Sequence, residues 1–392
     1  MHRFAVVRVL LLALVAGIAV VYVGAGARHP WDFETYYHAA SAYRVGLDPY
    51  QLQSLTSVAG RPVELPFLYP PATLLLFVPF SHLPLGAAIV AWLTIQCLLA
   101  GILLWIWWRT FLRSVAPDLL VVVALLGFDV ALLWNLRTGN VALAEQVLLW
   151  AGLAAYVRGR HSIAAVLIGL ASIFKLYPIA FLAIFLTAPG RRERLIPIGL
   201  GLAVFISVIA IPIVTLESWA HALAVGLRQA HPIPNADPSA PTILEWAIAL
   251  AGIPSPAARL VRAALYSLFV IVVLSSVIAH KRMRWAFGPV DHVVTAVILW
   301  LLLSPRVMVY SYTSAVVPSL FAIHQAIRRR AWRVAACALL LLQGFVRFLP
   351  GPPPIWLGTV SFLIMLATWV LWIRSREAGP TVRSVEPSAA PV

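Results

Sequence analysis

The acidic and aromatic residues after the first apolar run have the types and spacing that proton transfer needs. Asp32 lies in the segment 31–37, which also holds Glu34 and Tyr36. If this segment is helical, Asp32 and Tyr36 share a face, because residues four apart are neighbours on a helix. A carboxylate held there can accept a proton from a hydroxyl group, with Glu34 as a backup base or metal contact. The alternative is that Asp32 only caps the helix N-terminus.

Three cations lie where they could hold an anion. Lys175 is one of two lysines in the chain and lies between two short apolar segments, three residues before Pro178. A charge at membrane depth is costly and typically functional, so its ammonium suits a phosphate; the alternative is that it snorkels to the interface. Arg137 and Arg306 stand at the ends of apolar runs, where they would either bind a phosphate or anchor the chain.

Other polar residues lie in or near apolar runs. Tyr310 is typical of the aromatic belt at a membrane interface, and it is also a substrate-binding candidate. Asp129 and Glu145 lie inside apolar runs, where we expect carboxylates to be neutral or paired. We expect Cys97 and Cys337 to be small buried hydrophobic residues. The sequence contains no Walker loop, nucleotide fingerprint or Cys/His cluster, so we expect neither a metal nor a cofactor.

The elements that position these residues must be membrane helices. The chain has 392 residues, of which 62% are hydrophobic and only 11% charged, whereas soluble domains carry about a quarter charged residues. The apolar residues form runs of about 15 to 25, enough to cross the bilayer. They do not alternate as barrel strands do, so they must be helical. We predict an all-α, polytopic membrane protein with about twelve transmembrane helices and amphipathic helices on its outer face.

The twelve predicted crossings are separated by short basic segments and by two longer polar stretches. They are residues 4–23, 86–108, 118–135, 140–157, 162–174, 177–188, 195–214, 260–279, 291–304, 311–325, 334–349 and 355–373. We predict that the first run is a retained helix rather than a cleaved signal peptide, because it is long for one.

Charge sets the predicted orientation. Most of the 29 Lys and Arg residues fall on one side of this map, which the positive-inside rule makes the cytoplasm; the net charge of +15 therefore does not indicate nucleic acid. We predict one transmembrane domain, 1–376, with irregular outer loops at 24–84 and 215–258 and a disordered cytoplasmic tail at 377–392. The chain would be a multi-pass plasma-membrane protein with both termini in the cytoplasm.

Five short motifs in one order resemble glycosyltransferase family 87, over about residues 30–320. They are Asp32-Phe33-x-x-Tyr36-Tyr37 with Gly46-x-Asp48-Pro49-Tyr50, then Tyr69-Pro70-Pro71, Gly139-Asn140, Lys175-Leu176-Tyr177-Pro178 and Ser304-Pro305. Some members carry histidines after the Ser-Pro turn, where residues 306–312 of this chain hold none.

The resemblance implies a GT-C-like fold and a mannosyltransferase that uses a polyprenyl-phosphate sugar. Its partners would be the lipid bilayer, this donor and a lipid-linked or cell-envelope glycan as acceptor. Transfer would invert the anomeric carbon, with Asp32 as general base. The substrate-binding candidates are Glu34, Tyr36, Arg137, Asn140, Lys175, Tyr177, Arg306 and Tyr310.

Two other functions remain open at this point. A transporter or lipid flippase would also explain many helices and intramembrane charges, but we see no inverted repeat in the hydropathy. A ligase or polymerase of lipid-linked glycans would share the outer face and the chemistry, with a diphosphate donor instead.

Overall fold

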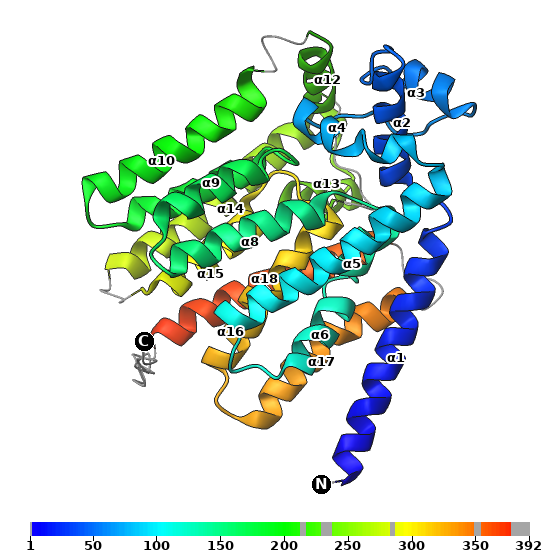
Figure 1. Ribbon diagram of the computed structural model, residues 1–392. Helices are drawn as coiled ribbons and strands as arrows, with labels where there is room; N and C mark the ends of the chain where they lie inside the picture. Colours follow the sequence, from blue (N-terminus) through cyan, green and yellow to red (C-terminus); the bar gives the residue numbers. More distant parts are fainter. Residues whose placement is uncertain (1, 212–216, 229–236, 283–286, 349–353, 378–392) are drawn as a thin grey trace, which may run out of the picture.

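The protein is helical throughout the residues that its structure describes. This computed structural model describes residues 2–211, 217–228, 237–282, 287–348 and 354–377 (Figure 1). All regular elements in these ranges are helices, as the sequence predicts. Residues 215–216 and 229–236 of the second polar stretch, and 378–392 of the expected tail, lie outside the described residues.

The helices follow the apolar runs of the sequence, with additional short helices in both polar stretches. In chain order they are α1 (His2–Gly26), α2 (Trp31–Arg44), α3 (Leu52–Ala59), α4 (Pro71–Phe77), η1 (Phe80–His82), α5 (Leu85–Thr110), α6 (Pro117–Leu126), α7 (Ala131–Thr138), α8 (Ala142–Val157), α9 (His161–Ala171), η2 (Tyr177–Thr187), α10 (Arg191–Phe205), η3 (Ile206–Ala210), α12 (Glu217–Arg228), α13 (Ala240–Leu250), α14 (Ser255–Arg282), α15 (Pro289–Leu303), η4 (Val309–Ala315), α16 (Val316–Ala326), α17 (Arg330–Arg347) and α18 (Pro354–Glu377).

Each predicted crossing coincides with one helix or with two consecutive helices. By length and composition, three described segments can cross a membrane: Leu85–Thr110, Ala257–Ile278 and Gly358–Arg376. Two bent pairs, α1 with α2 (41°) and α6 with α7 (64°), raise this number to five if each is one span. The chain is therefore a helical membrane protein. The count of twelve crossings and the placement of amphipathic helices on an outer face stay predictions.

Short helices lie within both polar stretches that were expected as irregular loops. The stretch 24–84 contains α2, α3, α4 and η1, and the described part of 215–258 contains α12 and α13. Aromatic packing explains the order of the first stretch. The ring of Phe33 stacks on that of Trp92 in α5, with centroids 6.0 Å apart, and the centroids of Tyr36 and Phe77 lie 4.8 Å apart. These buried rings hold α2 against α4 and α5.

The predicted run 118–135 is broken by a left-handed turn. Phe128, Asp129 and Val130 have φ angles of 52°, 56° and 52°, and α7 starts immediately after them. Each non-glycine residue in this region costs about 1–2 kcal/mol, so tertiary contacts must hold the turn. Asp129 is buried, with its carboxylate 3.7 Å from the Arg347 guanidinium at the end of α17.

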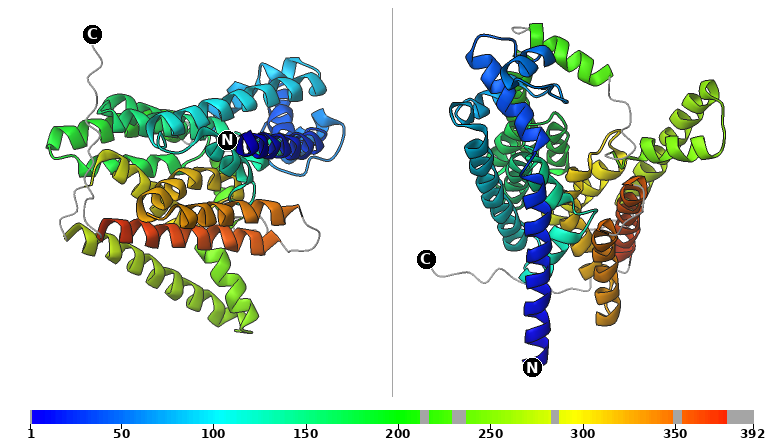
Figure 2. Two further views of the ribbon diagram at one scale, coloured as in Figure 1. Left: turned by 90° about the horizontal axis from the view of Figure 1, so that it is seen from below. Right: turned by 90° about the vertical axis from the view of Figure 1, so that its right-hand side faces the viewer.

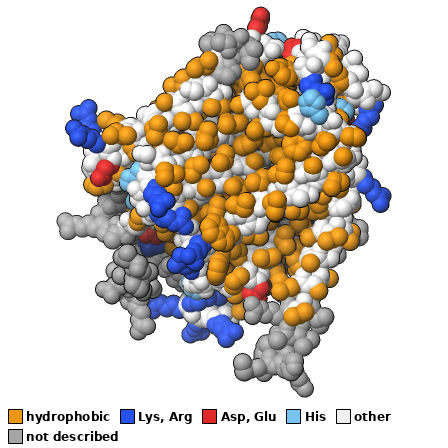
Figure 3. All heavy atoms as spheres, in the orientation of Figure 1, with side chains coloured by type: hydrophobic (Ala, Val, Ile, Leu, Met, Phe, Trp, Pro, Cys, Tyr) orange, Lys and Arg blue, Asp and Glu red, His pale blue; other side chains and the backbone are white. Residues whose placement is uncertain are grey.

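Helix termini meet at two ends of the molecule. At one end, Arg158 after α8 donates to the Thr110 hydroxyl of α5 (2.9 Å), and Arg376 of α18 pairs with Asp291 of α15 (2.6 Å). At the other end α2, α3 and α4 lie close to α12 (Figure 1), where the ring centroids of Tyr50 and Trp219 are 5.7 Å apart. Apolar side chains cover the broad face between the ends (Figure 3), as expected of a surface in contact with lipid.

The helices α13 and α14 form a pair at one side of the bundle (Figure 2). An ion pair between Arg262 of α14 and Glu245 of α13 links the two helices. Only 6% of the membrane-spanning window of α14 is buried by the rest of the protein, against 28% for α5. The apolar surface of α14 therefore needs another apolar environment, which a bilayer provides.

Candidate active site

The turn between α7 and α8 is fixed against the start of α2. Gly139 ends α7 in the left-handed region (φ 72°), and a Cβ atom there would lie 2.6 Å from the Cβ of Phe33. Two side chains of α5, one helical turn apart, hold the carbonyls of this turn. Trp92 donates its indole N–H to the Gly139 oxygen (2.8 Å), and Gln96 donates its amide to the Asn140 oxygen (2.6 Å).

This turn brings Asn140 to Asp32 across 108 residues of sequence. The Asn140 Oδ1 atom accepts the backbone N–H of Ala142, and its Nδ2 donates to Asp32 Oδ2, both at 2.9 Å. The cap alternative for Asp32 is wrong, because the N-cap of α2 is Pro30 and no side-chain cap bond forms. Asp32 lies instead in the first turn, where the helix dipole favours a carboxylate.

Tyrosine hydroxyls continue this polar group on the predicted face of α2. The Tyr36 hydroxyl donates to the Tyr69 hydroxyl at 3.0 Å, and Tyr50 donates to the Tyr69 carbonyl at 3.2 Å. Burial raises the pKa of the Tyr69 phenol far above its usual value, and the negative charge of Asp32 raises it further. Tyr69 therefore keeps its proton and can donate a hydrogen bond.

Lys175 is held inside the bundle, so the snorkelling alternative is wrong. Its side chain is 16% exposed, and its ammonium lies 4.0 Å from Glu145 Oε2 and 4.1 Å from the ring centroid of Tyr310. The described residues offer this ammonium no hydrogen-bond partner. It interacts electrostatically with Asp32 and with Arg306. A buried cation with unused donors can receive an anionic ligand.

Glu145 and Tyr177 form the other wall around Lys175. The Tyr177 hydroxyl donates to Glu145 Oε1, and the Tyr177 ring stacks on Trp300 of α15 with centroids 4.4 Å apart. The expectation that Glu145 is paired within the bundle is confirmed, because it contacts both Tyr177 and Lys175. Glu145 is thus the carboxylate next to the Lys175 ammonium and forms part of the site.

The segment that carries Tyr310 is held by amide side chains of α7 and α8. Asn135 and Gln146 each donate to the Tyr310 carbonyl at 3.2 Å. The Arg306 side chain is exposed and interacts electrostatically with Tyr310 and Lys175. These contacts to its carbonyl fix the backbone of Tyr310, whose ring lies 4.1 Å from the Lys175 ammonium.

The structure leaves two candidates outside this group. Arg137 lies over the ring of Tyr22, 4.6 Å from its centroid, and also contacts Trp134. Glu34 pairs with Arg61 and with His29 on another side of α2. The fold brings the other candidates together: Asp32, Tyr36, Asn140, Lys175, Tyr177, Arg306 and Tyr310.

Several polar residues that support the site were not candidates in the sequence. Gln96, Asn135 and Gln146 are buried amides inside apolar runs. Amides in such runs need internal partners, so their type and location were the available signal. Tyr69 was visible only as part of the Tyr-Pro-Pro motif.

The fold and this site define a helical membrane protein with an oriented carboxylate and a buried ammonium near one end of its bundle. The chain belongs to glycosyltransferase family 87, whose model matches residues 67–305, which is consistent with the GT-C superfamily. No curated protein and no solved structure matches it. It is therefore a membrane glycosyltransferase. Asp32 precedes the matched range, and its bond to Asn140 ties it to the family region.

Proposed function

We propose that the protein transfers a sugar, mannose by family resemblance, from a polyprenyl-phosphate donor to a lipid-linked or cell-envelope glycan. Asp32 is the general base and the anomeric carbon is inverted. The hydrogen bond from Asn140 to Asp32 is the observation that carries this proposal. It orients the carboxylate, which in this proposal accepts the proton of an acceptor hydroxyl.

The reaction needs one base and one site for an anion. The acceptor oxygen forms a bond to the anomeric carbon while the bond from that carbon to the phosphate oxygen breaks. The acceptor proton passes to the Asp32 carboxylate, and polyprenyl phosphate leaves with the bonding electron pair. Lys175 and Arg306 supply positive charge for this leaving group, and fixed charges at developing charge lower the barrier.

The proposal also places the reaction at the outer face of the plasma membrane, with both termini in the cytoplasm. Arg158 and Arg376, which belong to predicted inner segments, lie at the same end of the bundle. Asp32 and Asn140 belong to the predicted outer segments, and they meet each other in the structure. This segregation of basic ends supports the orientation given by the positive-inside rule.

The test is transfer of radiolabelled mannose from synthetic polyprenyl-phosphate-mannose by purified protein, with a total lipid extract as acceptor. Asp32→Asn should lower the rate about 10²–10⁴-fold, which is the contribution of a general base. The control is Asp48→Asn, because asparagine keeps the Oδ1 atom that accepts the Tyr50 N–H (2.9 Å) and loses only the exposed bond from Gln51 Nε2 to Oδ2 (3.2 Å).

Transfer in detergent, where no gradient exists, would distinguish the enzyme from a flippase. Near-wild-type transfer by Asp32→Asn would show that Asp32 is not the base. Equal losses in the Asp32 and Asp48 variants would instead indicate damage to the whole outer segment. A donor other than mannosyl phosphate would be identified by competition with other polyprenyl-phosphate sugars.

A further inference from the structure

Arg306 lies in a segment that has no regular structure of its own. Residues 304–308 connect the end of α15 to the start of η4 and belong to neither helix. Backbone N–H and C=O groups in such a segment have no helical partners and must be paired in other ways. Inside the segment, the Ser304 hydroxyl donates to the Arg306 carbonyl at 2.8 Å. The Arg306 side chain is exposed, so its position depends on how this backbone is held.

The residues directly before α13 hold this backbone on both sides of Arg306. On one side, the Ser239 hydroxyl donates to the Pro305 carbonyl at 3.2 Å. On the other side, the Asp237 Oδ1 atom accepts the Val307 N–H at 2.9 Å. Val307 is 1% exposed, so its N–H needs a partner within the protein. The two bonds therefore fix the peptide groups next to Arg306.

The same residues also hold η4, which carries Tyr310. The Pro238 carbonyl accepts the Tyr312 hydroxyl at 2.9 Å, and Tyr312 is 1% exposed. The ring of Tyr310, two residues before Tyr312, lies 4.1 Å from the Lys175 ammonium. The start of α13 is thus connected to two of the residues that meet at the candidate active site.

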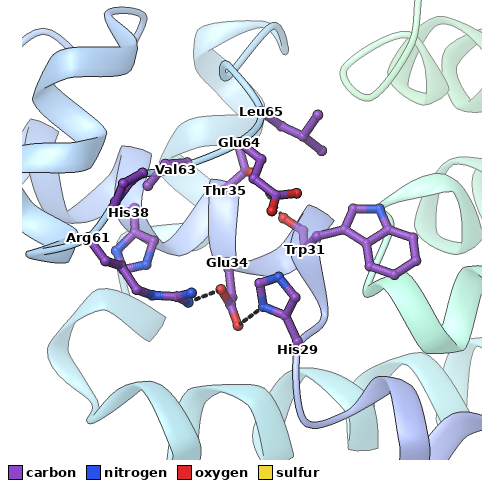
Figure 4. A pocket seen from close by; sticks show the side chains of 10 residues that line it. His29, Trp31, Glu34, Thr35, His38, Arg61, Val63, Glu64 and Leu65 are labelled. Carbon is purple, nitrogen blue, oxygen red and sulfur yellow. Dashed lines mark hydrogen bonds and ion pairs between the residues drawn. The ribbon is translucent and has the colours of Figure 1, made fainter.

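The Asp237 carboxylate is used differently from another carboxylate of the polar stretches. The Glu34 carboxylate pairs with two cationic side chains, Arg61 and His29 (Figure 4). Asp237 instead accepts a backbone N–H, although it is only 2% exposed. Burial of a carboxylate is costly unless its oxygens are hydrogen-bonded. Asp237 also interacts electrostatically with Arg306, so its location and its partners both point to the Arg306 segment.

The charge of Asp237 and its hydrogen bond would affect an anion at Arg306 in opposite directions. A negative charge near the guanidinium weakens the attraction for a phosphate, but interactions of exposed charges are small in water. The hydrogen bond fixes the backbone from which the guanidinium extends, and a misplacement of about 1 Å can cost 10²-fold in rate. We therefore expect the hydrogen bond to have the larger effect.

We propose that Asp237 is a positioning residue for the donor phosphate, because its bond to the Val307 N–H fixes the backbone that carries Arg306. The inference rests on the proposed function, in which Arg306 and Lys175 supply positive charge for the leaving group. Asp237 acts through Arg306 and does not contact the substrate. Without the bond, the segment 304–308 moves and the guanidinium is no longer held next to the phosphate.

Binding of farnesyl phosphate, a short prenyl phosphate, to the purified full-length protein tests this role without any transfer reaction. Farnesol, which lacks the phosphate, gives the background. Asp237→Ala and Asp237→Leu both remove the acceptor of the Val307 N–H, and leucine also fills the space of the side chain. In these variants the Kd should rise about tenfold. Asp237→Asn keeps the Oδ1 atom and should stay within about threefold of wild type.

Two further variants show the route of the effect. In Arg306→Gln, the additional change Asp237→Ala should raise the Kd less than about twofold, because no guanidinium is left to position. The matched control is Glu245→Gln in α13, because the Glu245 carboxylate pairs with Arg262 of α14. This control should bind farnesyl phosphate as wild type does. Thermal midpoints in detergent identify the variants that are folded.

Four results would overturn the positioning role. They are no phosphate-dependent binding in wild type, a wild-type or lower Kd in the folded Ala or Leu variant, an equal loss in Asp237→Asn, and a full tenfold further loss in the Arg306→Gln background. The third result would assign the effect to charge instead of the hydrogen bond. The fourth would show that Asp237 does not act through Arg306.

Transfer kinetics separate this inference from the proposed function. In Asp237→Ala the kcat should fall about tenfold, whereas the KM for the acceptor should not change, because the acceptor meets Asp32. A wild-type kcat and donor KM would refute the positioning role while transfer itself stands. If wild type does not transfer sugar but binds farnesyl phosphate in the Asp237-dependent way described above, the proposed function fails. Asp237 would then still position Arg306 at a phosphate site.

Discussion

The orientation of the Asp32 carboxylate depends on which atom of Asn140 faces it. Because the Ala142 N–H needs an acceptor, the Asn140 oxygen must point to Ala142, and the NH₂ group must point to Asp32. Gln96 holds the same residue by its backbone carbonyl. Asn140, which the sequence indicated as a substrate-binding residue, is thus placed to position the base.

Asn140→Asp separates this role from the support of the turn. The new carboxylate still accepts the Ala142 N–H, but in its charged form it has no donor for Asp32 and adds a like charge beside it. One of the two carboxyls then takes up a proton, which disfavours a base there. A hydrogen bond to a charged group contributes about 1.5–3 kcal/mol, so kcat should fall about 10- to 100-fold.

The measurement is kcat for sugar transfer, with the thermal midpoint in detergent as the check of folding. A wild-type kcat in this variant would show that Asn140 does not position Asp32. A parallel collapse of the thermal midpoint would mean that the turn itself had been lost.

Residue types were visible in the sequence, but their partners were not. Asp32 and Lys175 were chosen because a carboxylate and a lysine beside apolar runs need a reason to be there. The bond from Asn140 to Asp32 joins positions 108 residues apart, and no local pattern encodes it. Glu34 was chosen because it lies two residues from Asp32 in the sequence. Residues two apart on a helix face different sides, and Glu34 pairs with Arg61 instead.

At the scale of elements, the close approach of α2 to the α7–α8 turn depends on Gly139. This residue has a φ of +72°, and its missing side chain leaves room for Phe33. Gly159 ends the next helix with a φ of +73°, but a Cβ there would meet nothing within 4 Å. The two glycines therefore share their backbone conformation and differ in their surroundings.

Gly139→Ala should separate α2 from the turn and lower kcat. Alanine in the left-handed region costs about 1–2 kcal/mol at either position. At Gly139 the new Cβ would also lie 2.6 Å from the Phe33 Cβ, so α2 must shift. A displacement of about 1 Å can cost 10²-fold in rate, so kcat should fall about 10- to 100-fold. Gly159→Ala should keep the wild-type kcat and lose only stability.

Transfer kinetics and thermal midpoints of both variants give the comparison. Equal kcat values in the two variants would mean that the approach of Phe33 to the turn does not affect the site.

The break between α6 and α7 could not be predicted from the hydropathy pattern of the sequence. The apolar run 118–135 has the length and composition of one helix. The structure instead bends the two helices by 64° through three consecutive left-handed residues. Asp129 in this turn meets Arg347, more than 200 residues later in the chain. Hydropathy shows only that a segment is apolar. It cannot predict the tertiary contact that stabilises the bend.

At the scale of the whole molecule, the predicted crossings can be tested by counting them between two positions. Gln53 lies in α3 and Arg192 in α10, and both are exposed. Five predicted crossings separate them, an odd number, so they should face opposite sides of the membrane. If only α5 and the bent α6–α7 pair cross between them, the number is two and both face the same side.

Gln53→Cys and Arg192→Cys, each in a variant with Cys97 and Cys337 replaced by alanine, decide between these topologies. A membrane-impermeant maleimide on intact cells should label Gln53→Cys and should label Arg192→Cys only after permeabilisation. This result places α2 and Asp32 outside and the basic helix ends inside, as the positive-inside rule requires. Labelling of both positions in intact cells would support the smaller number of crossings. Labelling of Arg192→Cys alone in intact cells would show that the orientation is the reverse of the predicted one. Asp32 would then face the cytoplasm, which would contradict the proposed reaction at the outer face.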